Sequence, residues 1–335
     1  MRRFLHRSMG MVWVIGLCFF SQAAWAETQV HYLAHLNANT QKTATGAMAI
    51  AFKQRLQHLT EDQIRVEVFP KGQLGSQTQI VDLVKKGVIQ SAIVSVGGLS
   101  KAYPFIGILN FPFRFRDLQE TYDVFDGPFG RYMGADIEKK MGVSVLGYGD
   151  TGGLFVFTNH QREIRTPQDM QGLRFRTMRL SSHQTLIKSL GGTPLTIGWR
   201  ELYTALSNGT VDGQMNPAGI VQMGKFNEVQ THLTVSNHLY TPYIWIANPA
   251  YLAQLSPTHR AALAQAAKVG VKASRKLAAS ANSMEVLAKT MQIHYPTDAA
   301  LQQFKAATQP AMTRYIEQTL KEEGMALLRE FQASH

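Results

Sequence analysis

Cysteine is almost absent from this chain of 335 residues, because Cys18 is the only one. The chain beyond residue 18 therefore has no disulfide, no thiolate metal site and no cysteine nucleophile. A protein without these elements must be held together by its hydrophobic core. The roughly 300 residues that follow are enough for two ordinary domains.

Familiar catalytic motifs are also missing: the sequence contains no G-x-S-x-G and no P-loop. His31 and His35 have the helical spacing of a zinc site, but we expect them in a strand, where they would lie about 13 Å apart. "DTG" at 150–152 occurs once, whereas aspartic proteases need two such aspartates, so we interpret it as a turn. We therefore expect no metal site, no cofactor and no enzymatic activity.

Acidic residues are the minority, with 23 Asp and Glu against 34 Lys and Arg. Three of the basic residues and none of the acidic ones lie in residues 1–26, so the rest of the chain carries a net charge of +8. A positive field favours anionic ligands, although a merely basic surface is the alternative. The basic residues are scattered rather than grouped, which argues against nucleic acid and against an anionic membrane surface as partners.

Long hydrophobic runs are confined to the start of the chain. The basic head "MRRFLHR" is followed by "SMGMVWVIGLCFF", which has 13 residues, and by "AWA" at 24–26. This order is typical of a secretory signal peptide over residues 1–26. A membrane anchor is the alternative, but a spanning helix needs about 20 apolar residues. Leu17 is too bulky for a lipid-attachment site at Cys18. We therefore expect an exported, soluble mature protein.

The rest of the chain alternates between strand and helix patterns. We expect helices over 45–59, 76–87, 181–190 and 199–209, and strands over 28–37, 63–70, 88–96, 144–159, 173–178 and 210–217. This alternation predicts an α/β fold with helices on the faces of a sheet. The glycine-rich start of 144–159 indicates a crossover between domains.

A long helix is predicted from Pro257 to about Met291, with Ser256 as its N-cap. Such a helix would be about 50 Å long. That is longer than one domain needs, so we expect it to run along both domains and join them.

The strand at 173–178 carries an unusual charge. Leu173 and Phe175 point to one face of the strand, and Arg176 points to the other. A buried guanidinium without a partner costs several kcal/mol, so Arg176 needs an anion. Arginine matches a carboxylate with two N–H groups. That carboxylate belongs either to a ligand or to a protein side chain such as Asp169 or Glu201.

Other polar and aromatic side chains come at strand ends, where open α/β sheets bind ligands. Gln214 and Asn216 lie at the end of the 210–217 strand, and Trp199 lies just before a helix. Asparagine can donate a hydrogen bond to a ligand, and tryptophan offers a flat apolar wall. Trp199 can equally be a core residue, and Asn216 can simply cap a turn before Pro217.

Several long motifs resemble one family. They are "FPKGQLGSQTQIVDLVKKG", "LNFPFRFRD", "TPQDMQGLRFRTM", "LGGTPLTIGWRELYTALSNGTVDGQMNP" and "KFNEVQTHLTVSNH". Together they resemble the solute-binding proteins of TRAP transporters, the dicarboxylate-type (DctP) family, over nearly the whole mature chain. The resemblance implies a periplasmic, two-lobed α/β binding protein with crossing strands and a long domain-spanning helix. It also implies delivery of the ligand to the small and large integral membrane subunits of a TRAP transporter.

The resemblance assigns roles to individual residues. Arg176 stands where the family binds the substrate carboxylate, Asn216 lies beside that carboxylate, and Trp199 closes over the ligand. Two departures lower the charge of the expected pocket. Leu154 stands where some relatives carry a second arginine, and Ser95 and Gln77 replace acidic residues that bind sugar hydroxyls.

The remaining site residues complete this hypothesis. Arg179 either serves a second carboxylate or is a solvated surface charge, and we favour the surface charge. Asn37 and Ser95 are expected to reach the ligand from the other lobe. The lobes are expected to comprise residues 27–152 with 241–280, and residues 153–240 with 281–335.

We therefore expect a non-enzymatic, monomeric periplasmic protein that binds a small organic acid. The alternatives are a binding protein that serves a sensor and a secreted enzyme that acts on small acids. The residues leave the acid open between a C4-dicarboxylate, a 2-oxo or 2-hydroxy acid, a sugar acid and an aromatic acid.

Overall fold

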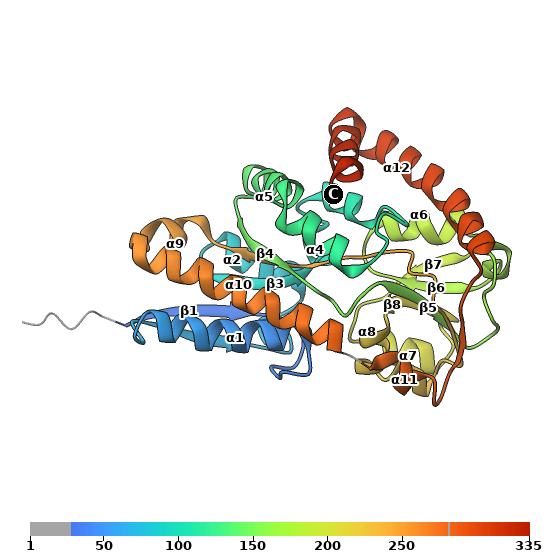
Figure 1. The fold of residues 1–335 in the computed structure, drawn as a ribbon, viewed down its shortest axis with the longest axis horizontal. Coiled ribbons are helices and arrows are strands. Elements are labelled where there is room, and N and C mark those ends of the chain that lie inside the picture. The colour runs from blue at the N-terminus through green and yellow to red at the C-terminus, as the bar shows by residue number, and fades with distance from the viewer. Residues whose placement is uncertain (1–27, 281) are drawn as a thin grey trace, which may run out of the picture.

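The computed structural model describes residues 28–280 and 282–335 and contains two separate sheets (Figure 1). One sheet has five strands in the order β2-β1-β3-β10-β4, and the other has six in the order β11-β9-β5-β8-β6-β7. We call each sheet with its covering helices a lobe, lobe I for the five strands and lobe II for the six. The predicted signal peptide lies outside the described residues.

Lobe I begins with the strand and helix alternation that the sequence predicts. Its elements are β1 (Gln29–Ala34), α1 (Ala44–Leu59), β2 (Ile64–Phe69), α2 (Gln77–Lys85), β3 (Ser91–Ser95), α3 (Val96–Leu99), η1 (Pro104–Asn110), α4 (Leu118–Asp126), α5 (Pro128–Met141), β4 (Ser144–Gly149), β10 (Tyr243–Ala247), α9 (Pro249–Gln254) and α10 (Pro257–Ser280). Strand β1 is parallel to β2 and β3, whereas β10 runs antiparallel between β3 and β4.

Lobe II carries the strand with Arg176. Its elements are β5 (Phe155–Asn159), η2 (Pro167–Met170), β6 (Arg174–Thr177), α6 (Ser181–Ser189), β7 (Thr193–Thr196), α7 (Leu202–Ser207), β8 (Gly213–Pro217), α8 (Ala218–Met223), η3 (Phe226–Glu228), β9 (His232–Thr234), α11 (Ser283–Leu287) and β11 (Gln292–His294). Strand β6 is parallel to β7 and β8, and β5 runs antiparallel beside β8.

Residues 150–154 cross from lobe I to lobe II. Gly152 and Gly153 have positive φ angles of 122° and 106°, which favour glycine, and both backbone N–H groups donate to the buried carboxylate of Asp150. The "DTG" stretch is therefore the turn at this crossing. Residues 147–152 also have the spacing G-x-G-x-x-G, but strand β5 follows them, whereas a dinucleotide-binding loop opens a helix.

The predicted helix from Pro257 to Met291 is shorter than expected. Helix α10 starts at Pro257 but covers 24 residues to Ser280, and the short helix α11 begins at Ser283. Ser280, Asn282 and Ser283 offer side-chain hydrogen bonds that compete with the helical backbone, which favours an interruption there. Helix α10 packs against α1 and β4, so it belongs to lobe I alone and does not join the lobes.

The segment that spans both lobes is α12 (Asp298–Ala333), two helical stretches joined by a kink at Lys321, and the sequence analysis missed it. Near its start Phe304 packs against Phe157 of lobe II, with ring centroids 6.2 Å apart. Near its end Phe331 packs against Phe129 of lobe I at 4.8 Å. Figure 1 shows this helix, in red, running from one lobe toward the other. The expectation that residues 281–335 belong to the second lobe is therefore wrong for the end of α12.

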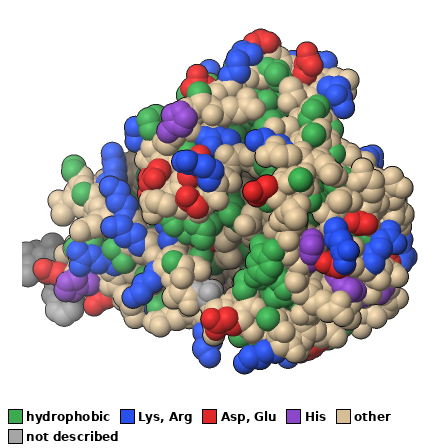
Figure 2. All heavy atoms as spheres, turned by 45° about the vertical axis from the view of Figure 1, so that its right-hand side comes forward, with side chains coloured by type: hydrophobic (Ala, Val, Ile, Leu, Met, Phe, Trp, Pro, Cys, Tyr) green, Lys and Arg blue, Asp and Glu red, His purple; other side chains and the backbone are tan. Residues whose placement is uncertain are grey.

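The surface agrees with the scattered charge of the sequence. On the face in Figure 2, basic and acidic side chains are interspersed, and hydrophobic side chains gather along the furrow in its middle. Within residues 28–280 and 282–335, no helix is both long enough and apolar enough to cross a membrane.

Candidate functional site

A cavity of about 470 Å³ lies between the lobes and is lined by residues of both. Six of the seven residues predicted for the site line its wall, and they are Asn37 and Ser95 of lobe I with Arg176, Arg179, Trp199 and Asn216 of lobe II. The edge of each sheet at which the parallel strands end supplies most of the polar groups. This is the location that open α/β sheets use for ligands.

Arg176 is the buried cation of this wall. It lies in β6 with 5% of its surface exposed, and its Nε donates a hydrogen bond of 2.9 Å to the backbone oxygen of Ile197. Among the described residues, its two terminal nitrogens have no hydrogen-bond partner. Burial lowers the pKa of Arg176 to about 10, and the charge of Glu201 opposes this shift. The guanidinium therefore stays charged at neutral pH and faces the cavity.

Neither protein carboxylate proposed for Arg176 forms an ion pair with it. Asp169 accepts hydrogen bonds from the backbone N–H groups of Arg165 and Thr166, at 2.9 and 2.8 Å. Glu201 lines the cavity, yet no ion pair joins it to Arg176 in the described part of the chain. The arrangement leaves an anchoring group for an anion that enters from outside.

Asn216 stands at the end of β8 with 8% of its surface exposed. Its Nδ2 donates to Oε1 of Gln214, two residues earlier on the same face of the strand. Gln214 was predicted to contact the ligand, but it is completely buried and does not line the cavity. The reason is its position in mid-strand, two residues before the strand end, where its side chain lies behind Asn216 and bonds Thr158.

Lobe I supplies uncharged polar groups. Nδ2 of Asn37 donates to Oη of Tyr243 at 3.0 Å, which holds the amide at the end of β1. The backbone N–H of Ser95 donates to Oε1 of Gln77 at 2.6 Å, and both residues line the cavity. This side of the cavity can therefore exchange hydrogen bonds with a ligand without adding charge.

Trp199, Arg179 and Leu154 differ in their position relative to the cavity. Trp199 is half-buried, lines the cavity and packs against Phe226 with ring centroids 5.6 Å apart, so it serves both the wall and the core. Arg179 lines the cavity but is exposed. Leu154 is outside the lining and packs against the hydrophobic core, so this position adds no group to the cavity.

Tyr243, Thr241 and Thr151 line the cavity and were missed by the sequence analysis. Tyr243 is the first residue of β10, which is antiparallel to its neighbours, so its start meets the carboxyl ends of β3 and β4. A search of strand ends alone does not find it. The direction of β10 has to be known first.

The two lobes contact each other beside the cavity. Nη2 of Arg200, in lobe II, donates to the backbone oxygens of Gly72 and Lys71 in lobe I, at 3.1 and 3.3 Å. Oγ of Ser100 in lobe I donates to the backbone oxygen of Arg179 at 2.9 Å. These contacts describe a closed arrangement, because an opening of the lobes would break them.

The family model described as bacterial extracellular solute-binding protein, family 7, matches residues 33–319. The chain belongs to this family. A curated relative of this solute-binding protein is the 2,3-diketo-L-gulonate-binding periplasmic protein YiaO of Escherichia coli, 30% identical over 80% of each chain. The C4-dicarboxylate-binding periplasmic protein DctP of Rhodobacter capsulatus is also 30% identical, over 69% of this chain and 68% of the relative.

Solved structures resemble this solute-binding protein over almost their whole length. A TRAP periplasmic solute-binding protein from Sulfurospirillum deleyianum with bound succinate has a TM-score of 0.82 and 28% identity, and the match covers 92% of this chain and 99% of that one. A Polaromonas protein bound to D-erythronate has the same TM-score and identity, with 91% and 99% covered. The two-lobed α/β fold is therefore that of TRAP solute-binding proteins.

Proposed function

We propose that this protein captures a small organic acid in the periplasm and delivers it to the membrane subunits of a TRAP transporter. The observation that carries the proposal is the buried Arg176, whose terminal nitrogens have no hydrogen-bond partner in residues 28–280 and 282–335. An acid entering the cavity supplies the missing carboxylate. A neutral analogue leaves the buried charge unpaired, so the site selects for acids.

The comparisons support a small organic acid as the ligand and a role in periplasmic transport. Relatives are named for binding 2,3-diketo-L-gulonate and C4-dicarboxylates, and structural neighbours hold succinate and D-erythronate. All of these are small carboxylates or their sugar-acid equivalents. The names of these relatives support a periplasmic location and a role in transport.

We propose that the protein acts without catalysis. Among the described residues, Thr45 of the cavity wall belongs to a hydroxyl–imidazole pair, in which its Oγ1 lies 3.0 Å from Nδ1 of His35. Burial lowers the pKa of His35 to about 4, while a hydrogen bond with Asn39 opposes the shift, so the ring is a weak base. Among the described residues no carboxylate pairs with His35, so the ring lacks the acidic partner of a catalytic triad.

A thermal-shift screen over a library of organic acids tests the proposal. A ligand at 100 times its Kd stabilises a protein by about 2.7 kcal/mol, which gives a clear rise in melting temperature. The matching amides and alcohols serve as controls and should give no rise. If no acid raises the melting temperature, or if the neutral analogues work equally well, the proposed function is wrong.

A further inference from the structure

Behind Asn216 lies a row of buried polar side chains that the binding proposal does not use. Asn216 donates to Oε1 of Gln214, and Nε2 of Gln214 donates to Oγ1 of Thr158 at 2.8 Å. Oγ1 of Thr158 then donates to Oε1 of Gln230 at 3.2 Å. Thr158 and Gln214 are 0% exposed and Gln230 is 1% exposed, so solvent does not complete these hydrogen bonds.

The β-sheet register brings this row together. Thr158 of β5 is directly opposite Gln214 of β8, and Val156 is opposite Asn216. Paired residues point to the same face of a sheet, as do residues two apart on one strand. The side chains of Thr158, Gln214 and Asn216 therefore lie next to one another on one face.

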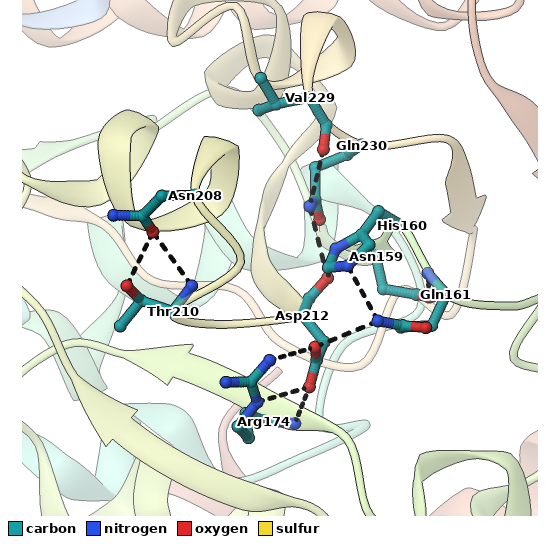
Figure 3. Close-up of polar contacts among 9 residues, drawn as sticks. All are labelled: Asn159, His160, Gln161, Arg174, Asn208, Thr210, Asp212, Val229 and Gln230. Atoms are coloured by element: carbon teal, nitrogen blue, oxygen red, sulfur yellow. Dashed lines mark hydrogen bonds and ion pairs between the residues drawn. The ribbon is translucent and has the colours of Figure 1, made fainter.

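The far end of the row determines its direction. Nε2 of Gln230 donates to the backbone oxygens of Val229 and Asp212, at 3.1 and 3.3 Å (Figure 3). Carbonyl oxygens accept hydrogen bonds and cannot donate them. The amide nitrogen of Gln230 must therefore face the two carbonyls, and its oxygen must face Thr158.

Each later hydrogen bond follows from this one. The hydroxyl of Thr158 donates to Gln230 and so accepts from Gln214. That turns the oxygen of Gln214 toward Asn216, which must offer an N–H. The reversed row would place the buried Oε1 of Gln230 against two carbonyl oxygens and leave it without a donor, at a cost of roughly 1–3 kcal/mol.

The carbonyl at Asp212 is itself held in place. The side-chain carboxylate of Asp212 accepts hydrogen bonds from Nη2 and Nε of Arg174, at 2.7 and 3.0 Å, and from the backbone N–H of Arg174 at 2.7 Å. Figure 3 shows these contacts beside the hydrogen bond from Gln230. The end of the row is therefore anchored to the strand that carries Arg176.

We propose that Gln214, Thr158 and Gln230 are positioning residues that set the orientation of the Asn216 amide through a one-directional chain of buried hydrogen bonds. Asparagine has two N–H donors and one oxygen acceptor. One donor is committed to Gln214, which leaves one N–H and Oδ1 for the cavity, in a fixed order. This role of Asn216 rests on the proposed function. In that function the remaining N–H donates to an oxygen of the bound acid.

Neutron diffraction from a deuterium-exchanged crystal without ligand tests the direction of the chain. We expect deuterons on Nδ2 of Asn216 toward Gln214, on Nε2 of Gln214 toward Thr158, and on the Thr158 hydroxyl toward Gln230. Any of these deuterons in the reversed position overturns the proposal. The result does not depend on which ligand the protein binds, so it is independent of the test of the proposed function.

Variants of Thr158 test whether the chain acts on Asn216. In a protein labelled with ¹⁵N-asparagine, the hydrogen-bonded proton of the Asn216 side chain should lose its low-field shift in Thr158→Val and regain it in the conservative variant Thr158→Ser. The Asn216→Asp variant assigns the signal by removing it. Unchanged Asn216 amide signals in Thr158→Val overturn the proposal.

The matched control is Thr234→Val in the same sheet. Thr234 is 1% exposed, and its hydroxyl donates to the backbone oxygen of Ile164 at 2.9 Å, outside the chain. This variant removes an equally buried hydroxyl and should leave the Asn216 signals in place. If Thr234→Val shifts them as much as Thr158→Val does, the effect is a general loosening of the sheet and the proposal fails.

Discussion

Arg176 is the residue on which the proposed binding depends, because among the described residues no carboxylate forms an ion pair with its buried guanidinium. Strand β6 directs the side chain into the wall, and the backbone oxygen of Ile197 holds Nε. The remaining donors face the cavity. Preorganisation of this kind lowers the cost of binding, since the side chain is already ordered when the ligand arrives.

We expect Arg176→Ala to weaken ligand binding by about 2–5 kcal/mol, because the acid then loses its buried charge partner. Isothermal titration with an acid identified in the thermal-shift screen measures the change. The control is Arg116→Ala, which removes a side chain that is 86% exposed on lobe I and should leave the affinity unchanged. A folded Arg176→Ala protein with unchanged affinity would contradict the assignment.

Matched monocarboxylates should bind at least as well as dicarboxylates. Among the described residues of the wall, Arg176 is the buried basic side chain, whereas Arg179 and Arg200 are exposed, and Leu154 adds no charge. A second carboxylate thus has no buried partner, and its burial is costly. Competition between butyrate and succinate analogues of the best ligand measures the preference. A marked preference for the diacid would instead identify Arg179 as a second anchor.

At the scale of elements, the close contact between helices α1 and α10 depends on a glycine. A Cβ atom at Gly270 of α10 would lie 2.7 Å from the ring of Trp245 and 2.8 Å from the backbone oxygen of Met48 in α1. Both distances are shorter than real contacts. The backbone of α1 cannot move aside without disturbing the sheet beneath it, so only glycine fits.

We expect Gly270→Ala to lower the free energy of unfolding by about 1–3 kcal/mol, as overpacking of a core does. Alanine has the higher helix propensity, so propensity alone predicts the opposite sign. Urea unfolding measures the change, with Lys268→Ala on the exposed side of α10 as the control. A Gly270→Ala protein as stable as the original would mean that the two helices can separate at little cost.

At the scale of the whole molecule, the site exists only where the two lobes meet. Asn37 of lobe I and Arg176 of lobe II face one cavity, and Arg200 joins the lobes beside it. On the proposed function, we expect a ligand to enter through an open form and to be enclosed in a closed one. Closure requires contacts that the ligand makes only in the closed form.

We expect the radius of gyration to fall when a confirmed ligand is added, because the ligand shifts the population toward the closed arrangement. Small-angle scattering at saturation measures this. In Arg200→Ala, which lacks the hydrogen bonds to Gly72 and Lys71, the fall should need more ligand. An identical scattering profile with and without ligand would indicate a rigid cleft.

Stability should fall as the pH drops from about 6.5 toward 4, before most carboxylates titrate. Burial lowers the pKa of His31 and His183 to about 3 and that of His35 to about 4, and lowers that of His238 well below its usual value. The unfolded chain takes up protons at these rings near pH 6.5 while the folded protein does not. Each such histidine contributes at most about 1.4 kcal/mol per pH unit, the value for uptake of one proton.

Urea unfolding at two pH values within this window and one above it measures the effect. The pKa values of Asp169 and Asp212 are also lowered in the folded protein. In the unfolded chain these carboxyl groups titrate near pH 4, so the stability that they contribute is lost only at lower pH. Equal stability at all three pH values would show that the rings are protonated in the folded protein.

The sequence by itself determined the first elements of lobe I and the place of Arg176 in a strand. Alternating and helical periodicities are local properties, so β1, α1, β2, α2 and β6 could be predicted within a few residues. The same alternation directed Arg176 to the face that carries the cavity. Local patterns set these features because each depends on neighbouring residues of one segment.

The tertiary structure decided which side chains share the site. Asn37 and Tyr243 are 206 residues apart and meet only because β10 inserts antiparallel between β3 and β4. Gln214 looked like a ligand contact and is instead buried, because its side chain lies behind Asn216 and bonds Thr158 of the next strand. The sequence predicted that the helix from Pro257 joins the lobes, but α12 joins them. Packing against both lobes, and not helix length, determines which segment does so. Such contacts bring together segments far apart in the chain, and no local pattern records them.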